Sequence, residues 1–221
     1  MLAENFAQAP YIQCVYGVII LKGRLKNNMP NYFFEPQELQ IGVNDRTFKI
    51  DDKILISEYI EGIETAIQFD VETQTLKGYT AEGFITEEND LWGFYKYMQN
   101  LPVREFIDSP HLVLRGTWLG LSKDKIIYSP TSYKKWYIHD IYGIRKHEWK
   151  NPTIVKGFCF AHDLPTTQVL YSGPFISWNH CKSFLGSSAY GRHQKGIIIK
   201  NISQLKKLES EKDNIYLKIS N

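Results

Sequence analysis

The sequence is poor in cysteine and has no long apolar run. The longest apolar candidates, residues 18–21 and 197–199, fall far short of the roughly 20 residues that a membrane-spanning helix needs. Residues 1–10 lack the charged and apolar regions of a signal peptide. These absences predict a cytoplasmic protein with no membrane partner. The cysteines are odd in number and have no CxxC spacing, so we expect small buried residues and neither a disulfide framework nor a zinc site: Cys14, Cys159 and Cys181.

Side chains suited to catalysis or metal binding do not form a recognised pattern. His147, Glu148, His162 and Asp163 are metal-ligand types, but their spacing matches no known site, and we predict no metal. The serine pair Ser187-Ser188 has no partner histidine in a nucleophile-elbow context, which disfavours a hydrolase triad.

The formal net charge of +2 is too small to indicate a nucleic-acid-binding protein by itself. The charge is nevertheless uneven. Residues 182–221 contain eight Lys or Arg and three Asp or Glu, a local charge of +5, so residues 1–181 carry −3. A basic segment of this kind favours phosphate binding, although a solvated charged helix at 204–212 is an equally good explanation of the charge alone.

No repeat, low-complexity tract or linker divides the 221 residues, and we predict one domain over 1–221. Strand patterns outnumber helix patterns without regular alternation, which predicts an α+β fold with antiparallel sheets. Three helices are predicted. The first is capped by Asn89 and ends before Pro102, the second is capped by Ser177, and the third runs from Ser203 to Lys212. The predicted strands cover residues 16–22, 53–58, 65–70, 112–115, 136–141, 168–171, 196–200 and 214–219.

Five short stretches occur in an order typical of one enzyme family. They contain glycines at strand ends, an aromatic strand and two lysine motifs. They are Ser57-Glu58-Tyr59-Ile60-Glu61-Gly62-Ile63-Glu64, Leu114-Arg115-Gly116-Thr117-Trp118-Leu119-Gly120, Trp136-Tyr137-Ile138-His139-Asp140-Ile141-Tyr142, Lys195-Gly196-Ile197-Ile198-Ile199-Lys200 and Tyr216-Leu217-Lys218-Ile219.

In this order the stretches resemble the nucleotidyltransferase domain of ATP-dependent RNA ligases. The resemblance covers about residues 53–219 and implies two antiparallel sheets around a nucleotide cleft. The chain ends at the closing lysine motif, so we expect no C-terminal OB-fold. ATP or AMP is the implied cofactor, and RNA or nucleotide the implied partner. Tyr137 and His139 correspond to the aromatic strand that supplies a stacking ring for adenine, although strand aromatics are more often core residues.

The chemistry of the family is not matched. Its nucleophilic lysine, which forms a lysyl-AMP, corresponds to Tyr59, and the neighbouring aspartate corresponds to Glu61, followed by Gly62. The family's two glutamates, one for the ribose and one for the metal and phosphates, correspond to Thr117 and Lys195. Because an ammonium group cannot be a metal ligand, we expect weak or no Mg²⁺ binding.

The formal charge summed over these four positions is −2 in the family and 0 in this chain, where they are Tyr59, Glu61, Thr117 and Lys195. The predicted pocket is therefore more positive by two charge units. Lys200 and Lys218 match lysines that the family uses on phosphates, and Arg192 lies near Lys195 in sequence. We therefore predict a site that holds a nucleotide or an RNA 5′-phosphate with fixed ammonium charges.

The resulting hypothesis is an RNA-ligase-like domain without catalysis that binds nucleotide or RNA ends. One alternative is an active ligase with displaced catalytic groups, in which Lys77 or Lys195 replaces the nucleophile. Lys53 is excluded because six strand residues place it about 20 Å from Tyr59. Another alternative is a protein-interaction scaffold whose cleft is filled by Tyr59.

Overall fold

The structure is a computed structural model that describes residues 12–15, 18–21, 33, 35–120, 128–207 and 216–221. Contacts divide the chain into two compact units, residues 1–31 and 32–221. In the first unit, β1 (Ile12–Val15) pairs antiparallel with β2 (Val18–Leu21). Residues 16, 17 and 22 of the strand predicted at 16–22 lie outside the described residues. The prediction of a single domain without an OB-fold stays a prediction.

The first sheet of the larger unit has six antiparallel strands in the order β10-β9-β8-β5-β6-β7. β5 and β6 form a hairpin. The strands are β5 (Ile63–Asp70), β6 (Thr75–Thr80), β7 (Gly83–Ile85), β8 (Leu112–Leu119), β9 (Lys135–Gly143) and β10 (Glu148–Trp149).

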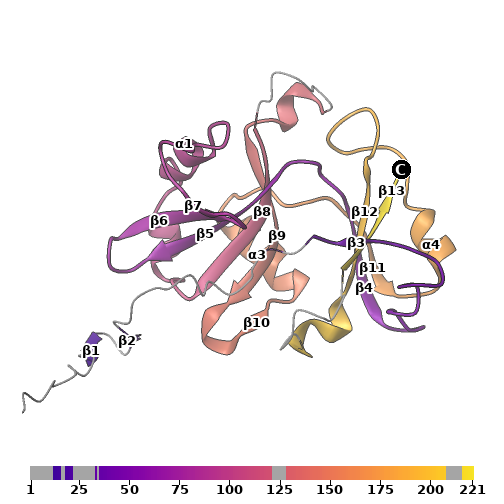
Figure 1. Ribbon diagram of the computed structural model, residues 1–221, viewed down its shortest axis with the longest axis horizontal. Coiled ribbons are helices and arrows are strands. Elements are labelled where there is room, and N and C mark those ends of the chain that lie inside the picture. The colour runs from indigo at the N-terminus through magenta and orange to yellow at the C-terminus, as the bar shows by residue number, and fades with distance from the viewer. Residues whose placement is uncertain (1–11, 16–17, 22–32, 34, 121–127, 208–215) are drawn as a thin grey trace, which may run out of the picture. The chain divides into compact units, whose positions relative to one another are not determined.

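The second sheet has five strands in the order β11-β4-β12-β13-β3. They are β3 (Gln37–Glu38), β4 (Lys53–Glu58), β11 (Val169–Pro174), β12 (Gly196–Asn201) and β13 (Tyr216–Ser220). All pairs are antiparallel except β3 with β13. The α+β prediction with antiparallel sheets is thus confirmed. Consecutive strands β4 and β5 belong to different sheets, so residues 59–62 lead from one sheet to the other (Figure 1).

Each sheet buries one face against its own helices. The six-stranded sheet packs Ile67, Leu114 and Trp136 against α1 (Phe94–Gln99), α2 (Arg104–Ile107) and α3 (Pro152–Ala161). The five-stranded sheet packs Ile54, Ile56 and Ile199 against Phe175 and Cys181 of the α4 (Trp178–Lys182) region. On β4 the residues between, Leu55 and Ser57, are half-buried, so the opposite face of this strand stays partly open.

The two sheets also contact one another. Trp149 of β10 and Tyr216 of β13 share a buried cluster with Leu205, which lies in the 3-10 helix η3 (Ile202–Lys207). Two shorter 3-10 turns occur at η1 (Pro130–Ser132) and η2 (Ile144–Lys146).

Two helix predictions are wrong in detail. Asn89 does not cap α1; Leu91 and Trp92 have left-handed φ angles of 42° and 56°, and the Asn89 side chain accepts a hydrogen bond from Thr86 N at 2.5 Å. The helix predicted at 203–212 is a 3-10 helix as far as Lys207, and residues 208–212 lie outside the described part. Ser177 caps α4 as predicted, accepting from His180 N.

Cys159 and Cys181 are buried free thiols, as predicted, and Cys14 has no described side chain. Among the described residues, no helix is long and apolar enough to cross a membrane.

Candidate functional site

The four motif glycines, Gly62, Gly116, Gly120 and Gly196, stand where a side chain has no room, and two of them join separate motifs. A Cβ atom at Gly62 would lie 2.7 Å from both Thr117 Cγ2 and the Trp118 carbonyl oxygen. Gly196 has φ 154°, and a Cβ there would collide with the Ile219 carbonyl oxygen. Gly62 lets the turn after β4 lie against β8, and Gly196 lets β12 approach β13. Gly62 and Gly196 therefore allow separate motifs to come into contact, and they do more than form turns.

Tyr59 occupies the position of the expected nucleophile. Its N–H donates to the Gly196 carbonyl at 2.9 Å, and its ring lies under the ammonium of Lys218, with Nζ 4.0 Å from the ring centroid. This is a cation–π contact. Burial raises the pKa of the Tyr59 phenol, and the nearby carboxylates Glu61 and Glu64 raise it further. Tyr59 is therefore a neutral phenol near neutral pH and a poor nucleophile.

Glu61 and Lys195 meet at the rim of the site. Lys195 Nζ lies 3.8 Å from Glu61 Oε2, and the two side chains are 40% and 50% exposed. The Glu61 N–H donates to the Tyr128 hydroxyl at 2.6 Å, which fixes the turn. The ion pair itself is worth little because solvent screens it. The Lys195 ammonium thus stays available to a stronger anionic partner.

Thr117 stands directly opposite Glu64 in the pairing of β8 with β5. The Thr117 hydroxyl donates to Glu64 Oε1 at 2.6 Å, while Glu64 Oε2 lies 3.1 Å from both Arg115 Nη2 and His139 Nε2. Burial alone would raise the pKa of Glu64, but His139, Arg115 and Thr117 outweigh it and lower the pKa to about 2. A carboxylate is therefore present beside Thr117, supplied by the neighbouring strand. Glu64 was not among the predicted site residues, since only the strand register identifies it.

His139 and Asp140 reach the same cluster because β9 has a bulge. The pairing of β8 with β9 shifts between Arg115 and Gly116, which leaves His139 as the extra residue. His139 Nδ1 lies 3.0 Å from Asp140 Oδ2, so the imidazole sits between two carboxylates. Burial alone would lower the pKa of His139, but Glu64 and Asp140 raise it above its usual value. His139 accordingly favours the protonated form.

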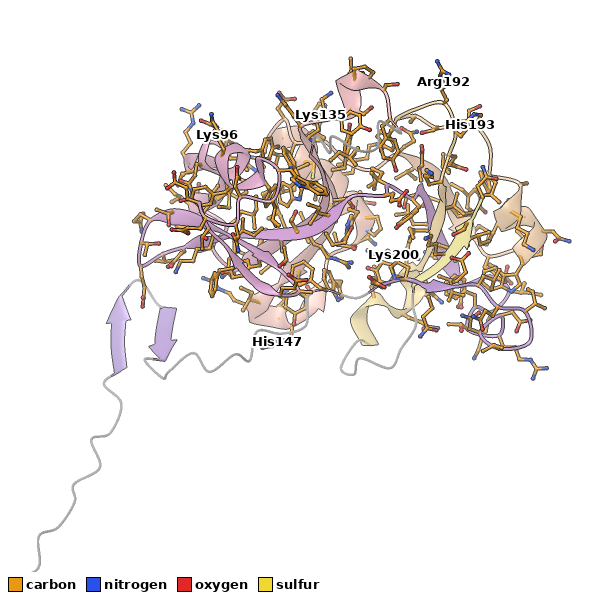
Figure 2. The ribbon with its side chains drawn as sticks, turned by 45° about the horizontal axis from the view of Figure 1, so that its top comes forward. Lys96, Lys135, His147, Arg192, His193 and Lys200 are labelled. Atoms are coloured by element: carbon orange, nitrogen blue, oxygen red, sulfur yellow. The ribbon has the colours of Figure 1, made fainter. Side chains whose placement is uncertain are left out.

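Lys200 lies in the interior where the two sheets meet (Figure 2). Its ammonium donates to Asp140 Oδ1, and the Tyr216 hydroxyl donates to the same oxygen at 3.1 Å. Burial alone would raise the pKa of Asp140, but Lys200, His139 and Arg115 hold it well below its usual value. The structure therefore places this lysine in an ion pair between β12 and β9. Its predicted phosphate contact stays untested.

Tyr137 belongs to an aromatic cluster beside the motif turn. Its ring centroid lies 4.8 Å from that of Tyr190 at an angle of 64°, and its hydroxyl donates to the Ser132 carbonyl at 3.0 Å. Only 6% of the residue is exposed. The cluster also contains Ile60, Leu119 and Tyr128. Packing is thus the observed role of Tyr137, and the predicted contact with adenine stays a prediction.

Arg192 and the adjacent His193 are exposed at the outer surface (Figure 2). The loop before it is anchored by the buried carboxylate of Glu58, which accepts from the Ser188 hydroxyl and from Ala189 N. Arg192 therefore stands on a loop fixed to β4. Lys77, a candidate replacement nucleophile, pairs instead with Asp70 within the β5–β6 hairpin.

These residues do not fit a divalent metal. Glu61, Glu64 and Asp140 are already paired with cationic side chains of the chain. Within the described ranges, no three His, Cys, Asp or Glu side chains are grouped as a metal site would need. The partly exposed ammonium groups of Lys195 and Lys218 suit an anion, although the carboxylates of Glu61 and Glu64 are also 50% and 38% exposed.

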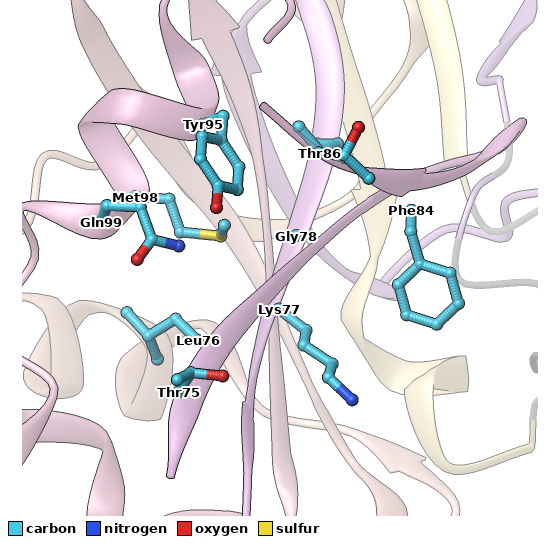
Figure 3. Close-up of a pocket in the computed structure, with 10 residues that line it drawn as sticks. Thr75, Leu76, Lys77, Gly78, Phe84, Thr86, Tyr95, Met98 and Gln99 are labelled. Atoms are coloured by element: carbon cyan, nitrogen blue, oxygen red, sulfur yellow. The ribbon is translucent and has the colours of Figure 1, made fainter. Parts of the chain in front are cut away.

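A separate open hollow of about 430 Å³ lies between β6, β7 and α1 (Figure 3). Leu76, Tyr95 and Met98 line it together with the polar side chains of Thr86 and Gln99. It contains none of the motif residues.

The fold matches those of solved ligases. An archaeal ATP-dependent RNA ligase has 14% identity and a TM-score of 0.64, with 86% of this chain and 48% of that chain covered. A Naegleria gruberi RNA ligase solved with ATP and Mn has 14% identity and a TM-score of 0.55, covering 78% and 50%. A putative ATP-dependent DNA ligase from Aquifex aeolicus has 16% identity and a TM-score of 0.57, covering 86% and 49%.

The chain therefore spans about half the length of these solved ligases. The likeness shows that it has the nucleotidyltransferase fold of the ligases. A comparison with curated proteins found no match. The RNA ligase family, in contrast, matches residues 52–219, which is most of the chain. The chain belongs to the RNA ligase family.

Proposed function

We propose that this chain is an RNA ligase-family domain that binds a nucleotide or an RNA 5′-phosphate end and does not transfer nucleotidyl groups. The observation that carries the proposal is the pair formed by Tyr59 and Lys218. A phenol stands at the position of the nucleophile, and an ammonium covers its ring at 4.0 Å. The family's covalent step requires an amine at that position.

The ionisable groups around Tyr59 also disfavour the covalent step. Tyr59 has a raised pKa, so the phenolate that would be needed for attack is disfavoured. The carboxylate of Glu64 is held by Thr117, Arg115 and His139. These side chains support a fixed electrostatic site.

Anion binding is supported by the lysines that remain partly exposed. Lys195 is 40% exposed and has only a weak pairing with Glu61 at 3.8 Å. Lys218 is half-buried on β13. It lies two residues before Ser220, whose strand partner Gly196 follows Lys195 in the sequence. Ammonium groups of this kind recognise phosphate as point charges. The solved Naegleria relative was determined with ATP and Mn, and we propose a nucleotide or phosphate ligand for this chain as well.

A binding measurement at low salt tests the proposal. We would titrate the protein with AMP and with two RNA oligonucleotides of one sequence, carrying a 5′-phosphate or a 5′-hydroxyl. The proposal predicts salt-sensitive binding of AMP or a preference for the phosphorylated end, and weaker binding by the Lys218→Ala variant. Lys96→Ala, on exposed α1, serves as the matched control and should bind like the unmodified chain.

The two rival functions give other results. An active ligase with displaced groups predicts a covalent AMP adduct, with Lys195 as the remaining candidate nucleophile. A protein-interaction scaffold predicts no binding of any of the three ligands at low salt, and that result would overturn the proposal. The fixing of the turn by Tyr128 and the packing of Tyr137 are the features that favour this second rival.

A further inference from the structure

The carboxylates of Glu61, Glu64 and Asp140 each face a cationic side chain of the chain. From this we infer that the site holds its ligand's phosphate without a divalent metal, and that Mg²⁺ competes with the protein for that phosphate. The inference rests on the proposed binding function and specifies how that binding is achieved.

The carboxylates that face the motif residues each have a cationic partner. Glu61 lies 3.8 Å from Lys195 Nζ, and Glu64 lies 3.1 Å from Arg115 Nη2. Asp140 accepts from the Lys200 ammonium and is buried. A Mg²⁺ ion needs near-octahedral oxygen ligands, so binding at Glu64 or Asp140 would have to displace a guanidinium or ammonium group, and the weakly paired Glu61 alone cannot supply the ligand set.

Of the other carboxylates near Tyr59, Glu35 is exposed, whereas Glu38 and Glu58 accept hydrogen bonds from the chain. Glu38, the neighbour of Lys218 across β3 and β13, accepts from Ser220 N at 2.7 Å and from Ser220 Oγ at 3.0 Å. Glu58 lies on the other face of β4 and accepts from the loop at residues 188–189. Neither carboxylate is free to complete a metal site with Glu61 or Glu64.

Lys195 and Lys218 provide the positive charge that a bound Mg²⁺ ion would otherwise supply. Lys218 is held by the Tyr59 ring, and Lys195 is held near the turn by Glu61. A phosphate that binds between such groups gains charge-assisted hydrogen bonds. Mg²⁺ in solution neutralises phosphate charge, so the metal weakens the attraction to the lysines.

The test measures AMP and 5′-phosphorylated RNA binding by calorimetry, in EDTA and in millimolar MgCl₂ at matched ionic strength. We expect the affinity to persist in EDTA and to fall in MgCl₂. The Lys195→Glu variant should lose about tenfold in affinity in EDTA, since a charge-assisted contact is replaced by repulsion. Because it creates a second carboxylate beside Glu61, the variant should recover part of that affinity when MgCl₂ is added.

Lys96→Glu is the control, with the same charge change on exposed α1, and it should match the unmodified chain under both conditions. Binding that appears only with Mg²⁺ or Mn²⁺ would overturn the inference and leave the proposed function intact. No binding of either ligand under any condition would overturn the proposed function, and the inference with it.

Discussion

Removing the carboxylate of Asp140 should destabilise the fold more than removing the ammonium of Lys200. The two side chains are 2% and 5% exposed, and their ion pair joins β9 of one sheet to β12 of the other. In an Asp140→Asn variant Lys200 becomes a buried cation without a counter-charge, since no other described carboxylate pairs with it. Losing one partner of a buried pair costs about 3–5 kcal/mol.

The reverse change leaves a better compensated site. In a Lys200→Met variant, Asp140 keeps the Tyr216 hydroxyl at 3.1 Å, His139 Nδ1 at 3.0 Å and Arg115 Nη1 at 3.8 Å. The loss should be close to that of one charge-assisted hydrogen bond, about 1.5–3 kcal/mol. The aliphatic methionine also fills the space of the lysine stem, which reduces the loss further.

Urea unfolding followed by tryptophan fluorescence measures both free energies of unfolding. The Asp140→Asn/Lys200→Met double variant should lose less than the sum of the single variants, because the buried charge is gone. Lys77→Met is the control, because its pair with Asp70 lies in a hairpin where Lys77 is 39% exposed, and the change should cost less than about 1 kcal/mol. A Lys200→Met loss equal to or larger than that of Asp140→Asn, or strict additivity, would refute this reasoning.

Three further predictions concern the carboxylates and lysines of the site. Thr117→Glu should lower the free energy of unfolding by about 1 kcal/mol or more, because like charges would stand directly opposite at Glu64, and the Glu64→Thr/Thr117→Glu exchange should restore part of it in the same urea assay. For single-stranded 5′-phosphorylated RNA, the slope of log K against log salt should be about −1.4 for two lysine contacts and about −0.7 in Lys218→Ala; an unchanged slope would remove Lys218 from the interface. Glu64 has a folded-state pKa lowered to about 2 from 4.5, so its charge contributes stability that is present above pH 4.5 and is lost as pH falls toward 2. The stability difference between the unmodified chain and Glu64→Gln should therefore shrink over that window, and a difference that grows on acidification would contradict the assignment.

Seven strands of the larger unit could be predicted because each is a short apolar or β-branched run bounded by turn residues, whereas β3, β6, β7 and β10 were not predicted. β4 matches its predicted range, and β12 and β13 differ from theirs by one or two residues at their ends. Helix α3 was not predicted, although Asn151 at the cap and Pro152 at the first position are ordinary start signals. Its Ile154, Val155 and Gly157 weaken the helical pattern and hid those signals.

The ionic cluster could not be predicted in the same way. Glu64 meets Thr117 across 53 positions of sequence, and Lys200 meets Asp140 across 60. Such pairs depend on strand register and on the bulge at His139, and a shift by one residue would turn these side chains to the other face. The motif positions can therefore be recognised in the sequence, whereas the pairing of the charges depends on the fold.

Intact-mass analysis after incubation with ATP and Mg²⁺ or Mn²⁺ tests the central claim most directly. The account predicts no AMP adduct on the unmodified chain. A Tyr59→Lys/Thr117→Glu/Lys195→Glu variant that also carries Glu64→Thr should gain one AMP, because it restores the amine and both glutamates without opposing carboxylates on β5 and β8. An AMP adduct on the unmodified chain would contradict the account and would identify an active ligase domain with a displaced nucleophile.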